Sequence, residues 1–471
     1  MNKYKKLINN SFIFAIGNLG SKLMQFIMIP LYSYTLTEQD FGKVDVLTTI
    51  ISILSLIMCL NITDAVFRFA LDKSENEVKI FSIGFWIIII VSLFALFFSI
   101  IISKIFPTYP IILTSLLLSI TMLNSLAANF SRATGFIKQF AIAGIINTFV
   151  MGVLNVILLV CFKIGMNGYM MSMILGLLSA TIYLFISCRL YNYLSLKGFD
   201  ILLFKQMCKY SLPLVPNGIA WWLNAASDRI FIVIMLGASA NGLYAMANKI
   251  PNMLSVLTNI FFQSWQISVV EEYKDNDAEK FITNVFNNFI SFMFLIGLVI
   301  IAFIRPLFKI IISSSYYNGW TLTPYLVLAI IYANISSFLE TIYMATKKTM
   351  PIFLTCLYGA IANIIFSVIL IKFIGISGAA IANILSFLIV SAFRLIHVIK
   401  IKKIKLNLKK IILLHMIFLF ASFVVLNLEN NYLAILIVLL LILTQIFIDK
   451  ESRGIIGKIF SRLNQILGLK S

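Results

Sequence analysis

Long apolar stretches separated by short polar segments run through the whole chain. A bilayer core about 30 Å thick needs about 20 mainly apolar residues in a helix. That length predicts fourteen transmembrane helices, over residues 11–34, 44–67, 80–102, 111–130, 140–162, 168–187, 210–236, 242–269, 281–304, 321–346, 351–371, 378–399, 411–425 and 432–448. The pattern therefore predicts an all-α integral membrane protein with short connections and no appended soluble domain.

Composition supports this class. The 471 residues are 61% hydrophobic and 12% charged, against about 45–50% and about 25% in soluble domains, which excludes a soluble globular enzyme. The five cysteines have no CxxC spacing and lie mostly in apolar runs, so they predict neither a disulfide framework nor a metal site. The basic, apolar N-terminus lacks a small-residue cleavage site and is interpreted as a retained first helix, not a signal peptide.

The excess of basic residues gives the orientation. Of 37 Lys and Arg, 28 fall in the segments that are cytoplasmic if the N-terminus is cytoplasmic, including seven from Arg394 to Lys410. Six fall in outer segments, and Lys22, Arg229 and Lys249 lie within the membrane. The positive-inside rule then places both termini in the cytoplasm. The net charge of +19 thus reflects topology and contact with membrane lipids, and it does not indicate nucleic acid.

An internal repeat predicts the domain organisation. YTLTEQDFGKVDV around Gly42 matches IMLGASANGLYAM around Gly242 at an offset of 200, and KIGMNGYMMSMILG matches FIGISGAAIANILS at an offset of 210. We expect a six-helix lobe over 1–195, a second over 196–403, and two additional helices with a basic tail over 404–471. Because six is even, the lobes are parallel repeats, an arrangement that places a substrate cavity between them.

Polar residues at helical spacing mark this predicted cavity. Charge at the centre of a bilayer costs at least about 2.5–3.5 kcal/mol, so such groups normally face a cavity or a partner. Stripes of this kind lie on the first, seventh, eighth and tenth predicted helices. The candidate substrate-binding residues are Lys22, Arg229, Lys249, Asp228, Asn18, Gln25, Asn224, Asn248 and Asn252. No residue pattern predicts a catalytic or metal site.

A second set of charges lies near the cytoplasmic helix ends. Asp64, Arg68, Arg132 and Glu340 are candidate gating or ion-coupling residues, and the i,i+4 spacing of Asp64 and Arg68 permits an ion pair. The alternative is that this pair is static and that Lys22 and Lys249 extend toward an interface. The candidate hinges are Pro30, Pro213 and Pro216, because proline removes a helical hydrogen bond.

The segments IGNLGSKLMQFIMIPLYSYTLTEQDFGKVDVL, AVFRFA and SLPLVPNGIAWWLNAASDRIFIVIMLGASANGLYAMANKIP carry a resemblance over most of the chain. They resemble the polysaccharide transporter family, the flippases of O-antigen and capsule repeat units, in the superfamily of multidrug and lipid II exporters. The resemblance implies a two-lobed, MATE-like bundle in the bacterial plasma membrane. It also implies a cationic cavity that moves a polyprenyl-diphosphate-linked oligosaccharide to the outer leaflet by alternating access. Lys22 and the Asp228–Arg229 dipeptide match the family's motifs.

Other functions remain open. A lipid II or teichoic-acid precursor flippase is the nearest alternative, followed by a multidrug cation antiporter and by a membrane glycan polymerase or ligase. We expect no enzyme activity and no bound cofactor. The energy source is open between the membrane potential and H⁺ or Na⁺ exchange through Asp228, Asp64 or Glu340. Expected partners are the lipid-linked glycan, membrane lipids, and a glycan polymerase with other assembly proteins.

Overall fold

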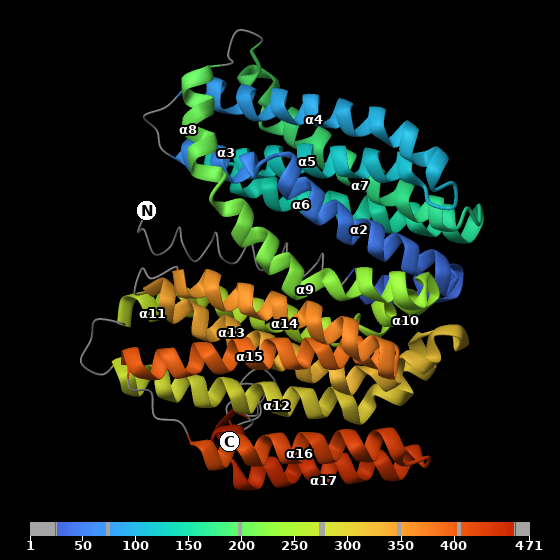
Figure 1. Ribbon diagram of the computed structural model, residues 1–471, viewed down its shortest axis with the longest axis vertical. Helices are drawn as coiled ribbons and strands as arrows, with labels where there is room; N and C mark the ends of the chain where they lie inside the picture. Colours follow the sequence, from blue (N-terminus) through green and yellow to red (C-terminus); the bar gives the residue numbers. More distant parts are fainter. Residues whose placement is uncertain are drawn as a thin grey trace, which may run out of the picture. The chain divides into compact units, whose positions relative to one another are not determined.

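The computed structural model describes residues 24, 26–71, 76–195, 200–272, 278–345, 350–402, 407–455 and 457. Over these residues the chain forms helices and no strand (Figure 1). Twelve helical segments are long and apolar enough to cross a membrane. The predicted all-α membrane class is therefore confirmed. The count of fourteen is not confirmed, because the first predicted helix lies largely outside the described residues and the eighth is interrupted.

Contacts between residues group the chain into two compact units. The first comprises residues up to Trp222 together with Leu236–Gly242. Its helices are residues 26–35, α2 (Glu38–Met58), α3 (Ile62–Leu71), α4 (Glu77–Ile105), α5 (Ile111–Ala133), α6 (Ile137–Asn155), α7 (Met166–Ser187), α8 (Ile201–Ser211) and the first part of α9 (Leu214–Leu236). Helix α5 packs against α3, α4 and α7, so its side chains form much of the core of this unit.

The second unit comprises Leu223–Met235 and the chain from Leu243 onward. It contains most of the second half of α9, the second half of α10 (Ala238–Ala247), α11 (Asn252–Glu272), α12 (Ala278–Ile311), α13 (Thr323–Ala345), α14 (Met350–Ile374), α15 (Ile376–Lys402), α16 (Leu408–Asn427) and α17 (Asn431–Ile448). Helix α15 packs against α13 and α14, and α12 packs against α13, α16 and α17.

Two predicted helices are interrupted, and both predictions of a continuous helix were wrong. The helix expected over 44–67 breaks between α2 and α3, where Leu60 and Asn61 have φ of 51° and 53°. These left-handed values cannot continue a right-handed helix. The helix expected over 242–269 breaks between α10 and α11, next to Pro251, which lacks a backbone donor.

The glycines of the predicted repeat occupy equivalent positions. A Cβ on Gly42 would collide with the carbonyl oxygen of Ala238, and a Cβ on Gly242 would collide with that of Glu38. Both contacts lie in the first unit, and adding or subtracting 200 from the residue numbers converts one contact into the other. The backbones of α2 and the start of α10 are therefore in direct contact where these helices cross. In the second match, Gly165 and Gly375 have φ of 64° and 62°, each just before a helix. The local geometry thus supports the duplication.

The two helices beyond the second repeat are anchored to α12. Arg305 of α12 donates from Nη1 to the carbonyl of Leu428 at 2.6 Å, between α16 and α17. At the other end of the pair, Lys410 Nζ lies 3.1 Å from Asp449 Oδ1 and donates to the carbonyl of Asn287 on α12 at 3.2 Å. Buried charged groups of this kind need such partners, so they fix α16 and α17 against the second unit.

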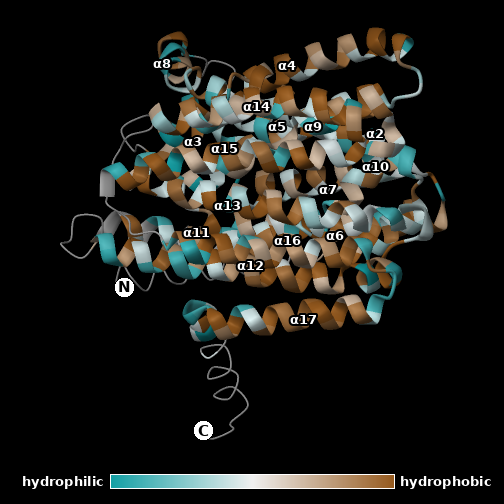
Figure 2. Ribbon diagram, turned by 60° about the horizontal axis from the view of Figure 1, so that its bottom comes forward, coloured by the Kyte–Doolittle hydropathy of each residue, from teal (hydrophilic) through white to brown (hydrophobic). Residues whose placement is uncertain are grey.

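Helices α4 and α17 are apolar along most of their length, as Figure 2 shows, yet only 17% of an apolar 18-residue stretch in each is buried inside the protein. In water such helices would leave large apolar areas exposed, which soluble proteins avoid. Their exposed Phe, Ile and Leu side chains are therefore suited to contact with lipid tails.

Candidate functional site

The second unit encloses a carboxylate, Asp228, in the second half of α9, and its side chain is 3% exposed. The hydroxyl of Tyr244 donates to Oδ2, and the amide of Asn383 donates to the same oxygen at 2.9 Å. The backbone N–H of Arg229 donates to Oδ1 at 2.9 Å. Burying an ionised carboxylate is very costly without such bonds. Donors on α9, α10 and α15 therefore replace water around Asp228.

A second layer of amides and hydroxyls extends this network to α14. The amide nitrogen of Asn363 donates to Asn383 Oδ1 at 2.7 Å and to Ser386 at 3.3 Å. Its oxygen accepts from Ser227 at 3.1 Å and from Ser367 at 3.4 Å. All five side chains are buried. Because both ends of the Asn363 amide are used, a continuous series of hydrogen bonds connects Asp228 to α14 through Asn383.

Close helix packing surrounds the network. A Cβ on Gly359 of α14 would collide with the side chains of Val390 on α15 and Asn224 on α9. Asn224 is 2% exposed, and its Oδ1 is buried without a hydrogen-bond partner in the described part of the chain. An unpaired buried oxygen of this kind costs about 1–3 kcal/mol. Asn224 Oδ1 can therefore accept a hydrogen bond from a further donor.

The two described cations of the predicted substrate set lie in this unit. Arg229 follows Asp228 on α9, and Lys249 lies in the turn between α10 and α11; both are half-buried. Asn248, in the same turn, donates to the carbonyl of Tyr244 at 3.2 Å, and Asn252 is exposed at the start of α11. The helix break thus presents Lys249 and these two amides where a continuous helix was expected.

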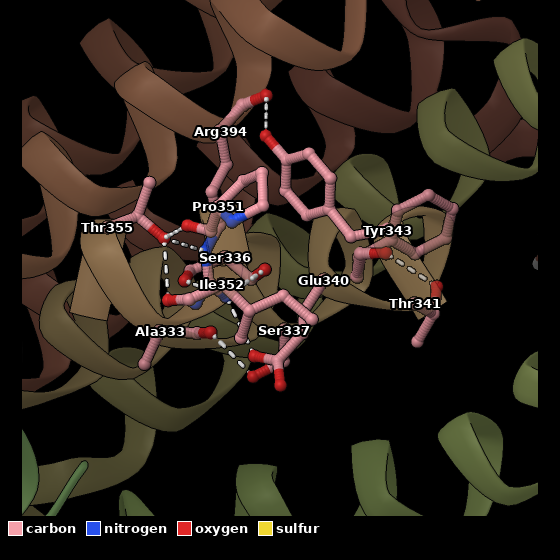
Figure 3. Close-up of polar contacts among 11 residues, drawn as sticks. Ala333, Ser336, Ser337, Glu340, Thr341, Tyr343, Pro351, Ile352, Thr355 and Arg394 are labelled. Atoms are coloured by element: carbon pink, nitrogen blue, oxygen red, sulfur yellow. Dashed lines mark hydrogen bonds and ion pairs between the residues drawn. The ribbon is translucent and has the colours of Figure 1, made fainter. Parts of the chain in front are cut away.

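Glu340 lies in a separate buried cluster with Arg394, shown in Figure 3. Arg394 is 1% exposed, and its Nη1 lies 2.8 Å from Glu340 Oε2. The same nitrogen donates to the carbonyl and the hydroxyl of Ser336 at 2.9 and 3.0 Å, and Nε donates to Thr355 Oγ1 at 3.0 Å. The guanidinium therefore joins α13, α14 and α15.

The position of Arg394 corrects the sequence analysis, which counted this residue with the cytoplasmic basic segment. The predicted helix over 378–399 already contained Arg394, and a charge inside a helix needs a partner. Glu340, on another predicted helix, was the matching acid. Asn363 and Asn383 were also missed as site residues, although both are amides within predicted membrane helices.

In the first unit the predicted pair of Asp64 and Arg68 does not form. Both side chains are exposed on α3, and Asp64 Oδ2 accepts from Asn61 at 3.0 Å. Within the described ranges, no ion pair joins Asp64 to Arg68. Arg132, near the end of α5, lies over the ring of Phe67 at 4.3 Å instead of contacting an acid. The i,i+4 spacing permitted an ion pair, but Asn61 satisfies the carboxylate locally.

Of the three candidate hinge prolines, only Pro213 lies at a break between helices. Pro213 lies in the turn between α8 and α9, and Pro216 is the third residue of α9. Pro30 lies within the helical residues 26–35. The hinge function of the prolines stays a prediction.

The candidate residues Asn18, Lys22 and Gln25 fall outside the described residues.

The fold is similar to that of solved transporters. A structure described as the lipid II flippase MurJ, inward closed conformation, matches with a TM-score of 0.69 and 14% identity, covering 96% of this chain and 99% of that one. An inward-facing multidrug resistance MATE family transporter of the MOP superfamily matches with a TM-score of 0.66 and 12% identity, covering 83% of this chain and 100% of that one. The predicted MATE-like bundle is thereby confirmed.

No curated protein matches the sequence. The model of one protein family, described as polysaccharide biosynthesis protein, matches residues 7–265, which is more than half of the chain. This match includes the segments on which the resemblance to polysaccharide transporters rests. The protein is therefore a multi-pass membrane protein that belongs to the polysaccharide biosynthesis protein family.

Proposed function

We propose that the protein is a flippase that moves a polyprenyl-diphosphate-linked oligosaccharide, such as an O-antigen or capsule repeat unit, to the outer leaflet by alternating access. The observation that carries this proposal is the family match over residues 7–265 on a fold shared with a lipid II flippase. The family supplies the polysaccharide context, and the fold supplies a transporter architecture. Their combination favours transport of a glycan precursor over its chemical modification.

Charge supports an anionic headgroup as the substrate. A diphosphate has to be stabilised by cations when it leaves water, and Arg and Lys are the usual partners. Arg229 and Lys249 are half-buried in the second unit, and Lys22 is the third cation within a predicted membrane helix. The oligosaccharide needs polar hydrogen-bonding partners, and Asn248 and Asn252 offer side-chain amides on either side of Lys249 in the sequence. The polyprenyl tail stays in the bilayer.

The proposed orientation places both termini in the cytoplasm of a bacterial cell, in the plasma membrane. Its support is the distribution of Lys and Arg, 27 of which lie in segments assigned to that side when the buried Arg394 is left out. This orientation agrees with the direction of transport, because glycan precursors assembled in the cytoplasm start on that leaflet. A glycan polymerase and other assembly proteins are the proposed partners on the outer side.

The coupling step of the proposal uses Asp228, with H⁺ or Na⁺ as the transported ion. Three N–H or O–H donors are directed at its carboxylate and replace the water that a charge at this position would need. Binding of a cation or proton would neutralise this charge and release Tyr244 and Asn383 from it. Asp228→Asn keeps the size of the side chain and removes the charge. Export that keeps its dependence on an ion gradient in this variant would exclude Asp228 as the coupling group.

The experiment that tests the transport function uses a deletion strain complemented with variants. Lys22→Ala and Arg229→Ala should abolish surface glycan and cause lipid-linked oligosaccharide to accumulate on the cytoplasmic side, while the protein stays in the membrane. Lys104→Ala is the matched control, because Lys104 is exposed in the last turn of α4. Normal export in both test variants would remove the headgroup-binding hypothesis.

A lipid II or related cell-wall precursor flippase is the second candidate. The observation in its favour is coverage: the MurJ structure covers 96% of this chain and the MATE structure 83%. Transport of fluorescent lipid II in proteoliposomes, compared with a glycan precursor from the native pathway, separates the two candidates. Preferential transport of lipid II would replace the glycan assignment.

A further inference from the structure

Arg132, the penultimate residue of α5, is held between aromatic rings. Its Cζ lies 4.3 Å from the ring centroid of Phe67 on α3 and 5.8 Å from that of Phe140 on α6. Planar guanidinium groups stack well on aromatic faces. The two rings therefore fix the plane of this side chain, which is half-buried.

A hydrogen-bonded chain fixes its rotation within that plane. Arg132 Nη2 donates to Asn129 Oδ1 at 3.2 Å, one turn earlier on α5. The amide nitrogen of Asn129 donates in turn to the carbonyl of Thr63 on α3 at 3.4 Å. The orientation of the amide is thus set by the backbone of α3, and Asn129 acts as a positioning residue for Arg132.

Two of the three guanidinium nitrogens of Arg132 have no acceptor among the residues that the structure describes. Nε is enclosed by protein without a hydrogen-bond partner, and Nη1 makes no hydrogen bond within the described part of the chain. No ion pair among the described residues includes Arg132. Arg394 differs, since it binds Glu340 and neutral oxygens. Arg132 is therefore a positioned cation whose charge is not balanced by a carboxylate.

We propose that Arg132 binds the diphosphate of the lipid-linked substrate at the end of α5. Nη1 and the second N–H of Nη2 can donate to two phosphate oxygens in a bidentate arrangement, while Nη2 keeps its hydrogen bond to Asn129. Arg68, next to Phe67, and Lys138, two residues before Phe140, are exposed and add positive charge on the same two helices. In the sequence analysis Arg132 was a gating residue; its contacts instead fit anion binding.

This inference deepens the proposed function and rests on it. In the proposed topology the end of α5 lies on the cytoplasmic side, where the substrate starts. Arg132 would then hold the diphosphate at the start of the proposed transport cycle. A phosphate group is common to the diphosphate of the substrate and to anionic lipid headgroups, so the experiment separates these two sources.

The test measures binding of a glycan-free polyprenyl diphosphate to the full-length protein in nanodiscs of neutral lipid. Arg132→Gln should raise the Kd at least about tenfold, the loss expected for a charge-assisted hydrogen-bonding group. Arg132→Lys, which keeps the charge but loses the planar fork, should fall between that variant and the wild type. Arg189→Gln is the matched control, because Arg189 is an exposed arginine just beyond the end of α7. This control should bind like the wild type.

Competition identifies the source of the phosphate. Displacement by inorganic pyrophosphate, with little displacement by phosphatidylglycerol, supports recognition of the diphosphate. Complete displacement of the polyprenyl diphosphate by phosphatidylglycerol would show that Arg132 binds ordinary lipid headgroups. An equal rise of the Kd in Arg132→Gln and Arg189→Gln would show that only the overall positive charge matters. Either result overturns the proposal. Normal export in the deletion strain would refute the flippase function alone, since this binding assay does not require transport.

Discussion

The Glu340–Arg394 pair allows a quantitative test of what a buried charge contributes to this fold. The two side chains are 13% and 1% exposed, and the ion pair measures 2.8 Å. Removing one partner of such a pair leaves an uncompensated buried charge and costs about 3–5 kcal/mol, whereas replacing both with apolar residues is often neutral. We therefore expect Glu340→Leu and Arg394→Met to destabilise the protein by about 3–5 kcal/mol each.

The double variant is the decisive measurement. With both charges removed, Glu340→Leu/Arg394→Met should recover most of the loss, giving a coupling energy of several kcal/mol in a double-mutant cycle. Thermal unfolding of the purified protein in detergent, read from tryptophan fluorescence at one scan rate, supplies the comparison. Lys79→Met is the matched control, because the Lys79–Asp200 pair has the same kind of contact at 2.9 Å but is 46% and 30% exposed. That control should change the stability little, because solvent screens an exposed pair.

Additive losses in the cycle would refute this reasoning, since two independent charges do not couple. The same double variant also separates structure from gating. If the pair only joins α13, α14 and α15, the stable double variant should export glycan normally. If the pair opens during transport, as the gating hypothesis for Glu340 requires, the variant should be stable and inactive.

Two further predictions use the same unfolding assay. Gly42→Ala and Gly242→Ala should each destabilise the protein, because the added Cβ meets a backbone carbonyl. Gly144→Ala is the control and should be neutral or slightly stabilising, because nothing lies within 4 Å of its added Cβ. Equal effects of the three substitutions would contradict the close contact between α2 and α10. Burial alone raises the pKa of Asp449, but hydrogen bonds, led by that from Ser452, lower it to about 2. The pKa of an aspartate in the unfolded chain is about 3.9. The ionised Asp449 therefore stabilises the fold fully above about pH 4, and this stabilisation is lost as pH falls toward 2. Asp449→Asn should flatten that part of the plot of unfolding free energy against pH.

The sequence predicted those features that depend on residue type along one helix. Apolar length identified the membrane helices, and repeated glycines identified positions with equal backbone geometry, as at Gly165 and Gly375. It did not predict the break at Leu60 and Asn61, because neither residue is a glycine or proline. The break beside Pro251 carried a usable signal, since proline inside a helix removes a hydrogen bond.

Side-chain partners were harder to predict, because they depend on which helix faces which. Asp64 and Arg68 had favourable spacing but form no pair within the described residues. Arg394 and Glu340 are 54 residues apart and do pair. Spacing along one helix reports only possible local contacts, whereas packing between helices determines which charges meet. A buried charge is therefore best paired by asking which other predicted helix carries the opposite charge.

The contacts of the membrane-associated charges suggest a division of roles that stripes of polar residues could not reveal. Asp228 and Arg394 are each surrounded by donors or acceptors from several helices, so they join helices within the second unit. Arg132 is positioned equally well, yet among the described residues its Nε and Nη1 have no acceptor and its Nη2 donates only to the neutral amide of Asn129. A protein that binds an anion only for part of its cycle must keep a cation oriented and unneutralised, despite the cost of doing so. Arg132 meets both conditions, which is why its contacts are better explained by a transient ligand than by structural support.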